Sequence, residues 1–201
     1  LKMDINQQKK LLAGYYASVS YMDAMTGKLI KALEETGQRD RTIVIFTSDH
    51  GYHLGEHDMW SKVSIHEESA RVPLLISVPG KKPARCDSLV ELLDLYPSVS
   101  RLCGLKIPGN LQGQDISQML DDPRVRVRDA ILCSSKGRLY RDERWALLQY
   151  GKNGELYDME KDPKQYTNLF SNPDYSETVA LLKQKLKSKL VEVSRNDLGK
   201  D

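Results

Sequence analysis

The sequence lacks the features that mark several classes of protein. Its 201 residues include only three cysteines, and these have neither the spacing of zinc ligands nor that of a disulfide scaffold. No apolar run approaches the roughly 20 residues of a membrane-spanning helix. There is also no basic arm, and no mixture of basic and aromatic residues that would indicate nucleic-acid binding. The sequence therefore indicates neither a membrane span nor a nucleic-acid partner.

Charge and length leave the class of protein open. The chain has 30 lysines and arginines and 28 aspartates and glutamates, which give a formal net charge of +2. This charge argues neither for nor against an anionic substrate. The length suffices for one large or two small domains with a real core. The sequence shows no signal peptide, but it begins with Leu1, so we expect its natural start upstream and draw nothing from that absence.

One apolar run ends abruptly at polar residues. Ile43–Phe46 is rich in β-branched residues, which predicts a strand buried on both faces. It is followed by Ser48, Asp49, His50 and Gly51. In a parallel α/β sheet, ligands collect outside the carboxyl ends of the strands. Asp49 and His50 are therefore candidate ligands of a divalent cation, but Ca²⁺ takes about six to eight donors, so others must come from elsewhere.

The loop after this strand is unusually rich in functional side chains. All four histidines of the chain lie between His50 and His66, together with Trp60 and Lys62. Such a loop is a poor candidate for a mere connector. A plainer alternative remains open, in which Asp49 caps backbone amides in an Asx-turn and the other side chains, Lys62 included, are solvated.

The remaining pattern predicts helices and strands in two regions. Apolar spacing predicts helices at 7–36, closed by Gly37, and at 92–103, starting near Asp94, with a strand at 72–78 between them. These elements suit a parallel or mixed sheet covered by helices.

The pattern of apolar and polar residues changes near residue 121. Short alternating segments separated by turn residues predict a small antiparallel sheet, with strands at 130–133, 138–140, 145–150 and 155–157. A helix at 175–193 follows, and its apolar stripe is expected to face the core: Val179, Leu182, Leu186 and Leu190. We therefore expect two domains, residues 1–120 and 121–201.

The segment SDHGYHLGEHDMWSK at 48–62, followed by HEESARVPLLISVPG at 66–80, resembles a signature region of the sulfatase family, within the alkaline-phosphatase-like superfamily. The similarity continues through Tyr15–Gly37, Leu89–Leu105 and Gly154–Leu169. Among subgroups, the pattern is most similar to iduronate-2-sulfatase-like and choline-sulfatase-like members. The resemblance implies an α/β fold: the C-terminal part of an alkaline-phosphatase-like α/β sandwich, then a small antiparallel sheet with a C-terminal helix.

The resemblance also implies roles for five residues. Asp49 and His50 match the pair that completes the family's Ca²⁺ site, where Mg²⁺ is an alternative. Lys62 matches the catalytic lysine that contacts the sulfate group, and His53 and His57 are expected to bind substrate. The chemistry agrees, because a cation and a fixed ammonium stabilise the negative charge that develops as a sulfate ester is cleaved.

One family motif is missing. The family's nucleophile is a formylglycine made from the first residue of a Cys/Ser-x-Pro-x-Arg motif, and none of the three cysteines begins such a motif. Ser77 precedes Val-Pro-Gly, but Lys81 stands where the arginine belongs. The chain therefore resembles the C-terminal half of a sulfatase, and we expect its partner to be a missing N-terminal half that carries the formylglycine.

The implied function is hydrolysis of sulfate monoesters, with sulfated small molecules and sulfated glycans as candidate substrates. Two alternatives remain open: a phosphonate or phosphate monoester hydrolase of the same superfamily, and a non-catalytic module that binds sulfated glycans. The resemblance implies a secreted, periplasmic or lysosomal protein. The isolated 201-residue chain is expected to be inactive, because its nucleophile is absent.

Overall fold

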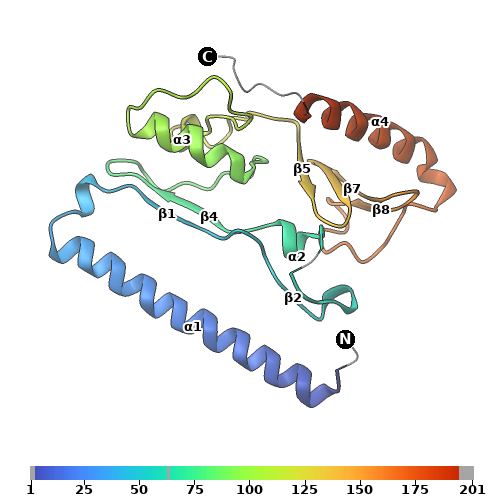
Figure 1. Cartoon of the computed structure of the whole chain (residues 1–201), viewed down its shortest axis with the longest axis horizontal. Helices are drawn as coiled ribbons and strands as arrows, with labels where there is room; N and C mark the ends of the chain where they lie inside the picture. Colours follow the sequence, from blue (N-terminus) through green and yellow to red (C-terminus); the bar gives the residue numbers. More distant parts are fainter. Residues whose placement is uncertain (1–2, 63, 195–201) are drawn as a thin grey trace. The chain divides into compact units, whose positions relative to one another are not determined.

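The computed structural model describes residues 3–62 and 64–194, which form two compact units (Figure 1). The first unit comprises residues 3–62 and 71–81, and the second comprises residues 64–70 and 82–194. The chain thus leaves the first unit, contributes a short segment to the second, and returns. This division differs from the predicted domain boundary at 120/121, which stays a prediction.

The first unit begins with a long helix, α1 (Ile5–Glu35). Asp4 caps its first turn in a capping box, in which the Asp4 carboxylate accepts from the Gln7 amide at 2.9 Å and the Gln7 side chain accepts from the Asp4 amide at 3.0 Å. The helix ends because Gly37 adopts a left-handed conformation with φ of 67°. The helix predicted for residues 7–36, with its glycine stop, is confirmed.

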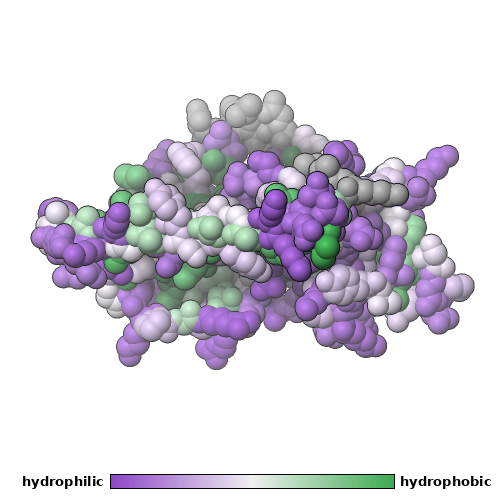
Figure 2. All heavy atoms as spheres, turned by 90° about the horizontal axis from the view of Figure 1, so that it is seen from below, coloured by the Kyte–Doolittle hydropathy of each residue, from purple (hydrophilic) through white to green (hydrophobic). Residues whose placement is uncertain are grey.

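No residue of α1 is buried within the part of the chain that the structure describes. Apolar side chains such as Tyr16, Val19 and Leu29 are exposed, and green and white spheres lie among purple ones along α1 in the space-filling view (Figure 2). The apolar spacing that predicted this helix normally marks a face that packs on a core. Here Tyr15 of that face contacts Tyr52 with ring centroids 5.3 Å apart, but none of its residues is fully buried among the described residues.

Two short strand pairs complete the first unit. After the 3₁₀ turn η1 (Arg39–Arg41), strand β1 (Val44–Thr47) pairs antiparallel with β4 (Leu74–Ser77). The sequence left a parallel or a mixed sheet open, and this pair is antiparallel. Every residue of β1 is half-buried and not fully buried, because β4 is its only neighbouring strand in the described chain. The second pair is the hairpin of β2 (His53–Leu54) and β3 (Trp60–Ser61), with η2 (Glu56–Asp58) at its tip.

The second unit is built on a four-stranded antiparallel sheet in the order β5-β6-β7-β8. Its strands are β5 (Ala130–Ser134), β6 (Arg138–Asp142), β7 (Trp145–Tyr150) and β8 (Asn153–Asp158). After the turn η5 (Pro173–Tyr175), helix α4 (Ser176–Val193) packs on one face of the sheet. The predicted sheet and the predicted C-terminal helix are both confirmed.

Alternation along β7 separates two cores. Leu147 faces the cluster that contains Leu182 and Leu186 of α4, which confirms the predicted stripe of that helix. Ala146 and Leu148 face the opposite cluster. Among the described residues, every fully buried apolar side chain belongs to the second unit.

The segment at 64–70, which includes the short helix α2 (Glu67–Ala70), forms part of the second core. Ile65 is fully buried there. The His66 ring lies 2.8 Å from a carboxylate oxygen of Glu155, and the Glu67 amide donates to the Gln165 side chain at 2.9 Å. These contacts join residues about ninety positions apart, so no local pattern predicts them.

A buried ion cluster joins Asp94 to the segment before β5 in the second unit. The 3₁₀ turn η3 (Leu92–Asp94) leads into α3 (Leu95–Leu102), and η4 (Ser117–Leu120) follows. The helix predicted for residues 92–103 is confirmed. Asp94 makes no side-chain cap of α3. Its carboxylate accepts from the Glu91 amide at 2.8 Å and the Gln114 amide at 2.7 Å, and it pairs with Arg128.

Between residues 3 and 194, with residue 63 left aside, no helix combines the length and the apolar character that crossing a membrane requires.

Candidate active site

A tight turn after β1 presents Asp49 and His50 together. The Ser48 hydroxyl donates to the His50 carbonyl at 2.8 Å, and the His50 amide donates to Oδ1 of Asp49 at 3.1 Å. The turn thus uses one carboxylate oxygen of Asp49. The other, Oδ2, lies 3.5 Å from Nε2 of His50. The Asp49 side chain is 83% exposed, so this second oxygen is accessible.

The hydrogen bonding of His50 suits a metal ligand. Its Nδ1 lies 2.8 Å from the carbonyl oxygen of Gly51, and a carbonyl only accepts, so Nδ1 carries the proton. In the neutral imidazole, Nε2 then holds a free electron pair. Histidines that bind metals commonly donate their other ring nitrogen to a backbone carbonyl in this way.

The spacing of the two donor atoms also fits one cation. Ligand atoms at about 2.0–2.5 Å from a shared ion lie roughly 3 Å apart at a right angle, close to the 3.5 Å between Nε2 and Oδ2. Asp49 and His50 could therefore hold a divalent cation together with further ligands. Within the described chain no group of three or more histidine, cysteine, aspartate or glutamate side chains could hold one alone.

The electrostatics keep Asp49 charged. Desolvation would raise the pKa of Asp49, but His50, the amides of Asp49 and His50, and the ammonium of Lys62 together hold that pKa below its usual value. A carboxylate that is ionised at neutral pH is ready to bind a cation. The ammonium of Lys62 makes the smallest contribution to this lowering of the pKa.

The β2–β3 hairpin carries Lys62. His53 pairs with Ser61 across the hairpin, and Lys62 follows directly as an exposed side chain. The hairpin is closed by the Glu56 carboxylate, which accepts from the Leu54 amide at 2.6 Å. A short, hydrogen-bonded hairpin therefore fixes the backbone immediately before the lysine.

The backbone of this hairpin is strained. His57, Asp58 and Ser61 have φ values of 54°, 56° and 85°, a region that side-chain-bearing residues rarely adopt. Gly55, at φ of 120°, lies under Trp60, whose ring would be 3.3 Å from an added Cβ. Strain of this kind clusters at functional sites, where surrounding contacts maintain it.

The two remaining candidate histidines lie inside the hairpin. The rings of His53 and His57 are 6.0 Å apart in an edge-to-face arrangement. His53 is only 1% exposed, and His57 is half-buried. The structure thus brings Asp49, His50, His53, His57 and Lys62 into one unit, while the substrate-binding role of the two histidines stays a prediction.

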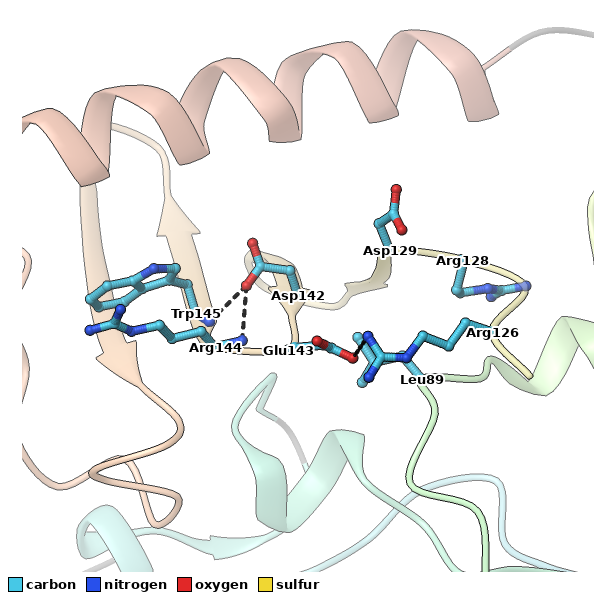
Figure 3. Close-up of a pocket in the computed structure, with 8 residues that line it drawn as sticks. All are labelled: Leu89, Arg126, Arg128, Asp129, Asp142, Glu143, Arg144 and Trp145. Atoms are coloured by element: carbon cyan, nitrogen blue, oxygen red, sulfur yellow. Dashed lines mark hydrogen bonds and ion pairs between the residues drawn. The ribbon is translucent and has the colours of Figure 1, made fainter. Parts of the chain in front are cut away.

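Sequence reasoning missed a cavity of about 310 Å³ in the second unit (Figure 3). It lies where the β6–β7 turn meets the segment that leads into β5. The sequence predicts a hairpin turn at 141–144 whose arginines are solvated or reach an anionic substrate. It does not predict a cavity there, because the other wall comes from residues well upstream.

Comparison with known proteins gives two overlapping family matches. Residues 2–105 match the family described as Sulfatase. Residues 55–192 match the family described as N-sulphoglucosamine sulphohydrolase, C-terminal. Together these matches cover nearly the whole chain, including the Asp49 turn and the Lys62 hairpin.

Three individual proteins illustrate the similarity. An arylsulfatase of Clostridium perfringens is 31% identical over 188 residues, which are 88% of this chain and 39% of that protein. A solved structure of a 2-O GAG sulfatase has a TM-score of 0.86 at 26% identity, over 94% of this chain and 44% of the other. The phosphonate monoester hydrolase of Agrobacterium radiobacter has a TM-score of 0.76 at 26% identity, over 89% and 40%. The chain thus spans about two fifths of the length of the proteins it matches.

Proposed function

The chain belongs to the sulfatase family, and from this premise we propose that it is the part of a sulfuric ester hydrolase that contributes Asp49, His50 and Lys62 to the active site. The observation that carries the proposal is the Asp49–His50 pair. Its two donor atoms, Oδ2 of the ionised carboxylate and Nε2 of the imidazole, lie 3.5 Å apart. The positive charge of Lys62 contributes to the lowered pKa of Asp49.

Each residue has a role that its geometry supports. Asp49 and His50 hold the cation, Ca²⁺ or alternatively Mg²⁺, which when bound supplies positive charge beside the sulfate oxygens. Lys62 donates to the sulfate group and stabilises the charge that develops on its oxygens during cleavage. His53 and His57 are proposed to line the substrate side of the hairpin. His57 is the more accessible of the two.

The remainder of the active site is proposed to come from an N-terminal half that carries the formylglycine nucleophile and the other metal ligands. The first unit supports this view, because none of its apolar side chains is fully buried among the described residues. A unit that exposes the apolar residues of a 31-residue helix is suited to be covered by further chain.

The proposed substrates are sulfate monoesters of small molecules or glycans. The similarity to a 2-O GAG sulfatase favours a sulfated glycan. A secreted, periplasmic or lysosomal location accords with such a substrate, and the iduronate-2-sulfatase-like or choline-sulfatase-like subgroup remains the proposed placement within the family.

The alternative enzymatic function is hydrolysis of phosphonate or phosphate monoesters. It is favoured by one observation, the similarity to the phosphonate monoester hydrolase. A cation and a lysine ammonium stabilise charge on tetrahedral phosphorus as well as on sulfur. A non-catalytic module that binds sulfated glycans would instead need neither the cation nor a nucleophile.

The first test is a peptide map of the protein isolated from its natural source. We expect a further peptide with the Cys/Ser-x-Pro-x-Arg motif, lighter than its coded mass. The 201-residue chain by itself should not hydrolyse an aryl sulfate. Turnover by this chain alone, free of contaminating enzyme, would refute the assignment of the nucleophile to another segment.

The second test uses the complete enzyme with aryl sulfate and aryl phosphonate as competing substrates. Lys62→Ala should lower kcat/KM for the sulfate about 100- to 1,000-fold, the usual cost of losing one such charge-stabilising donor. Lys187→Ala, at an exposed position of α4, should leave it unchanged. Faster turnover of the phosphonate would favour the alternative function. Equal activity of both variants would show that Lys62 has no role in the reaction.

A further inference from the structure

The cavity in the second unit is lined by opposite charges in equal number. The residues that line it include three arginines and three acidic residues: Arg126, Arg128, Arg144, Asp129, Asp142 and Glu143. Its volume, about 310 Å³, lies at the lower end of the range for small-molecule sites. The cavity is therefore large enough for a compact polar ligand.

The balance of charge selects the kind of ligand. All three arginines already pair with carboxylates, Arg126 with Glu143, Arg128 with Asp94 and Arg144 with Asp158, so a free anion finds no unpaired guanidinium group. Asp142 accepts from two backbone amides and lies 3.9 Å from Lys185, which leaves little unpaired negative charge for a free cation. A sugar hydroxyl both donates and accepts a hydrogen bond, whereas a carboxylate only accepts and a guanidinium only donates. A ring that carries several hydroxyl groups can therefore satisfy both kinds of wall.

Some of these charged groups are available to a ligand. The ion pair between Arg126 and Glu143 is more than half exposed on both sides, so it contributes little and is easily exchanged for ligand contacts. Figure 3 shows the Glu143 carboxylate turned toward Arg126. The Asp129 side chain is exposed, and within the described residues it forms no hydrogen bond or ion pair.

The other groups form a fixed frame. Asp142 accepts from the amides of Arg144 and Trp145 at 3.1 and 2.8 Å, which holds the β6–β7 turn. Arg128 is 7% exposed and is tied into the Asp94 cluster. The guanidinium of Arg144 lies 4.8 Å from the centre of the Trp145 ring, so the aromatic edge of the cavity is also fixed.

We propose that this cavity is an accessory subsite that binds an uncharged sugar unit, so that the second unit grips an unsulfated residue of a glycan. The proposal rests on the proposed function only for its choice of a glycan, because the binding requires neither Asp49 nor Lys62. It assigns to the second unit a ligand of its own, separate from the sulfate group.

The two tryptophans of the chain make a direct test feasible. The indole N–H signals of Trp60 and Trp145 are assigned by nuclear magnetic resonance with Trp60→Phe and Trp145→Phe. The chain is then titrated with N,N′-diacetylchitobiose as the neutral probe, and separately with inorganic sulfate. We expect saturable shifts of the Trp145 signal with the disaccharide, none of the Trp60 signal, and no effect of sulfate on Trp145.

Two matched variants test the walls of the cavity. Asp129→Ala should weaken disaccharide binding roughly tenfold or more, as expected for the loss of one charged hydrogen bond. Asp23→Ala, at an exposed position of α1, should bind like the original chain. Because Asp129 forms no hydrogen bond within the described residues, its replacement should leave the unfolding midpoint unchanged.

Three results would overturn the proposal: no shift of the Trp145 signal at any reachable disaccharide concentration, a shift caused equally by inorganic sulfate, or equal binding by the Asp129 and Asp23 variants. Lys62→Ala should leave disaccharide binding intact. If the chain binds the disaccharide but the complete protein hydrolyses no sulfate ester, the proposed function fails and the subsite stands.

Discussion

The hydrogen bond between the His50 ring and the Gly51 carbonyl shows how much a single contact decides at the scale of residues. It fixes the tautomer of the imidazole and so leaves the electron pair of Nε2 available to the ion that Asp49 and His50 are proposed to share. The sequence placed both residues correctly at the end of a strand. It could not predict the tautomer, because that depends on where a backbone carbonyl comes to lie in the folded turn.

Burial of two tyrosines in the sheet has a consequence at alkaline pH. Burial, with the Glu155 carboxylate, raises the pKa of Tyr150 to about 12, and burial together with the Tyr157–Glu155 hydrogen bond raises the pKa of Tyr157 as well. The unfolded chain loses these protons near pH 10. The stability that they contribute is therefore complete below pH 10 and is lost as the pH rises through the folded-state values.

We accordingly predict that the unfolding midpoint falls between pH 10 and pH 12, and that Tyr150→Phe makes this fall shallower. The comparison is made by thermal unfolding at several pH values, with Tyr166→Phe, at an exposed tyrosine, as the control. Identical pH profiles of Tyr150→Phe and the original chain would contradict the prediction.

At the scale of elements, the helices and the second sheet could be predicted because their patterns are local. The apolar spacing of α4 and the turns between β5 and β8 each lie within a few residues of the elements that they define. The antiparallel pairing of β1 with β4 could not be predicted, because about thirty residues separate the strands. The positive φ values of His57, Asp58 and Ser61 could not be predicted either, because no glycine at these positions indicates them.

The clearest prediction for the elements concerns the buried ion cluster that joins η3 to the segment before β5. Arg128→Met removes the cation that faces Asp94, whose side chain is 0% exposed. An unpaired buried carboxylate costs about 3–5 kcal/mol of unfolding free energy. Urea unfolding of the second unit should therefore shift to a much lower midpoint.

The matched control is Arg124→Met. Arg124 pairs with Asp122 at 2.9 Å, but its side chain is 89% exposed, and exposed pairs contribute little to stability. If both variants shifted the urea midpoint by the same amount, the Asp94 cluster would not be the element that stabilises this region.

At the scale of the whole molecule, the two units differ in how many apolar side chains they bury. The second unit buries apolar side chains on both faces of its sheet, whereas the first unit has no fully buried apolar side chain among the described residues. Because the Cys/Ser-x-Pro-x-Arg motif is missing, the sequence predicted that the chain is half of a larger fold. It could not predict that the segment at 64–70 belongs to the second unit, because Ile65 and His66 contact residues that are distant in sequence.

This difference predicts unequal protection from hydrogen exchange in the isolated chain. Backbone amides of α1 should exchange rapidly, because no residue of α1 is buried and a helix with little tertiary packing opens readily. Amides of α4, where Val179, Leu182 and Leu186 are buried, should exchange much more slowly. Mass spectrometry of peptic fragments measures both helices in one sample.

In the complete protein, α1 should become as well protected as α4. Equal protection of the two helices in the isolated chain would mean that α1 already has a partner, and the proposal that an N-terminal half covers it would lose its structural support.

The segment at 64–70 also has a consequence for synthesis on the ribosome. His66 and Glu155 are 89 residues apart, and Glu67 and Gln165 are 98 apart. At about 5–20 residues per second, the ribosome needs roughly 5–20 seconds to make the strands on which this segment packs. During that interval Ile65 has no core to enter, so the stretch just after the Lys62 hairpin is a natural point of engagement for chaperones in the growing chain.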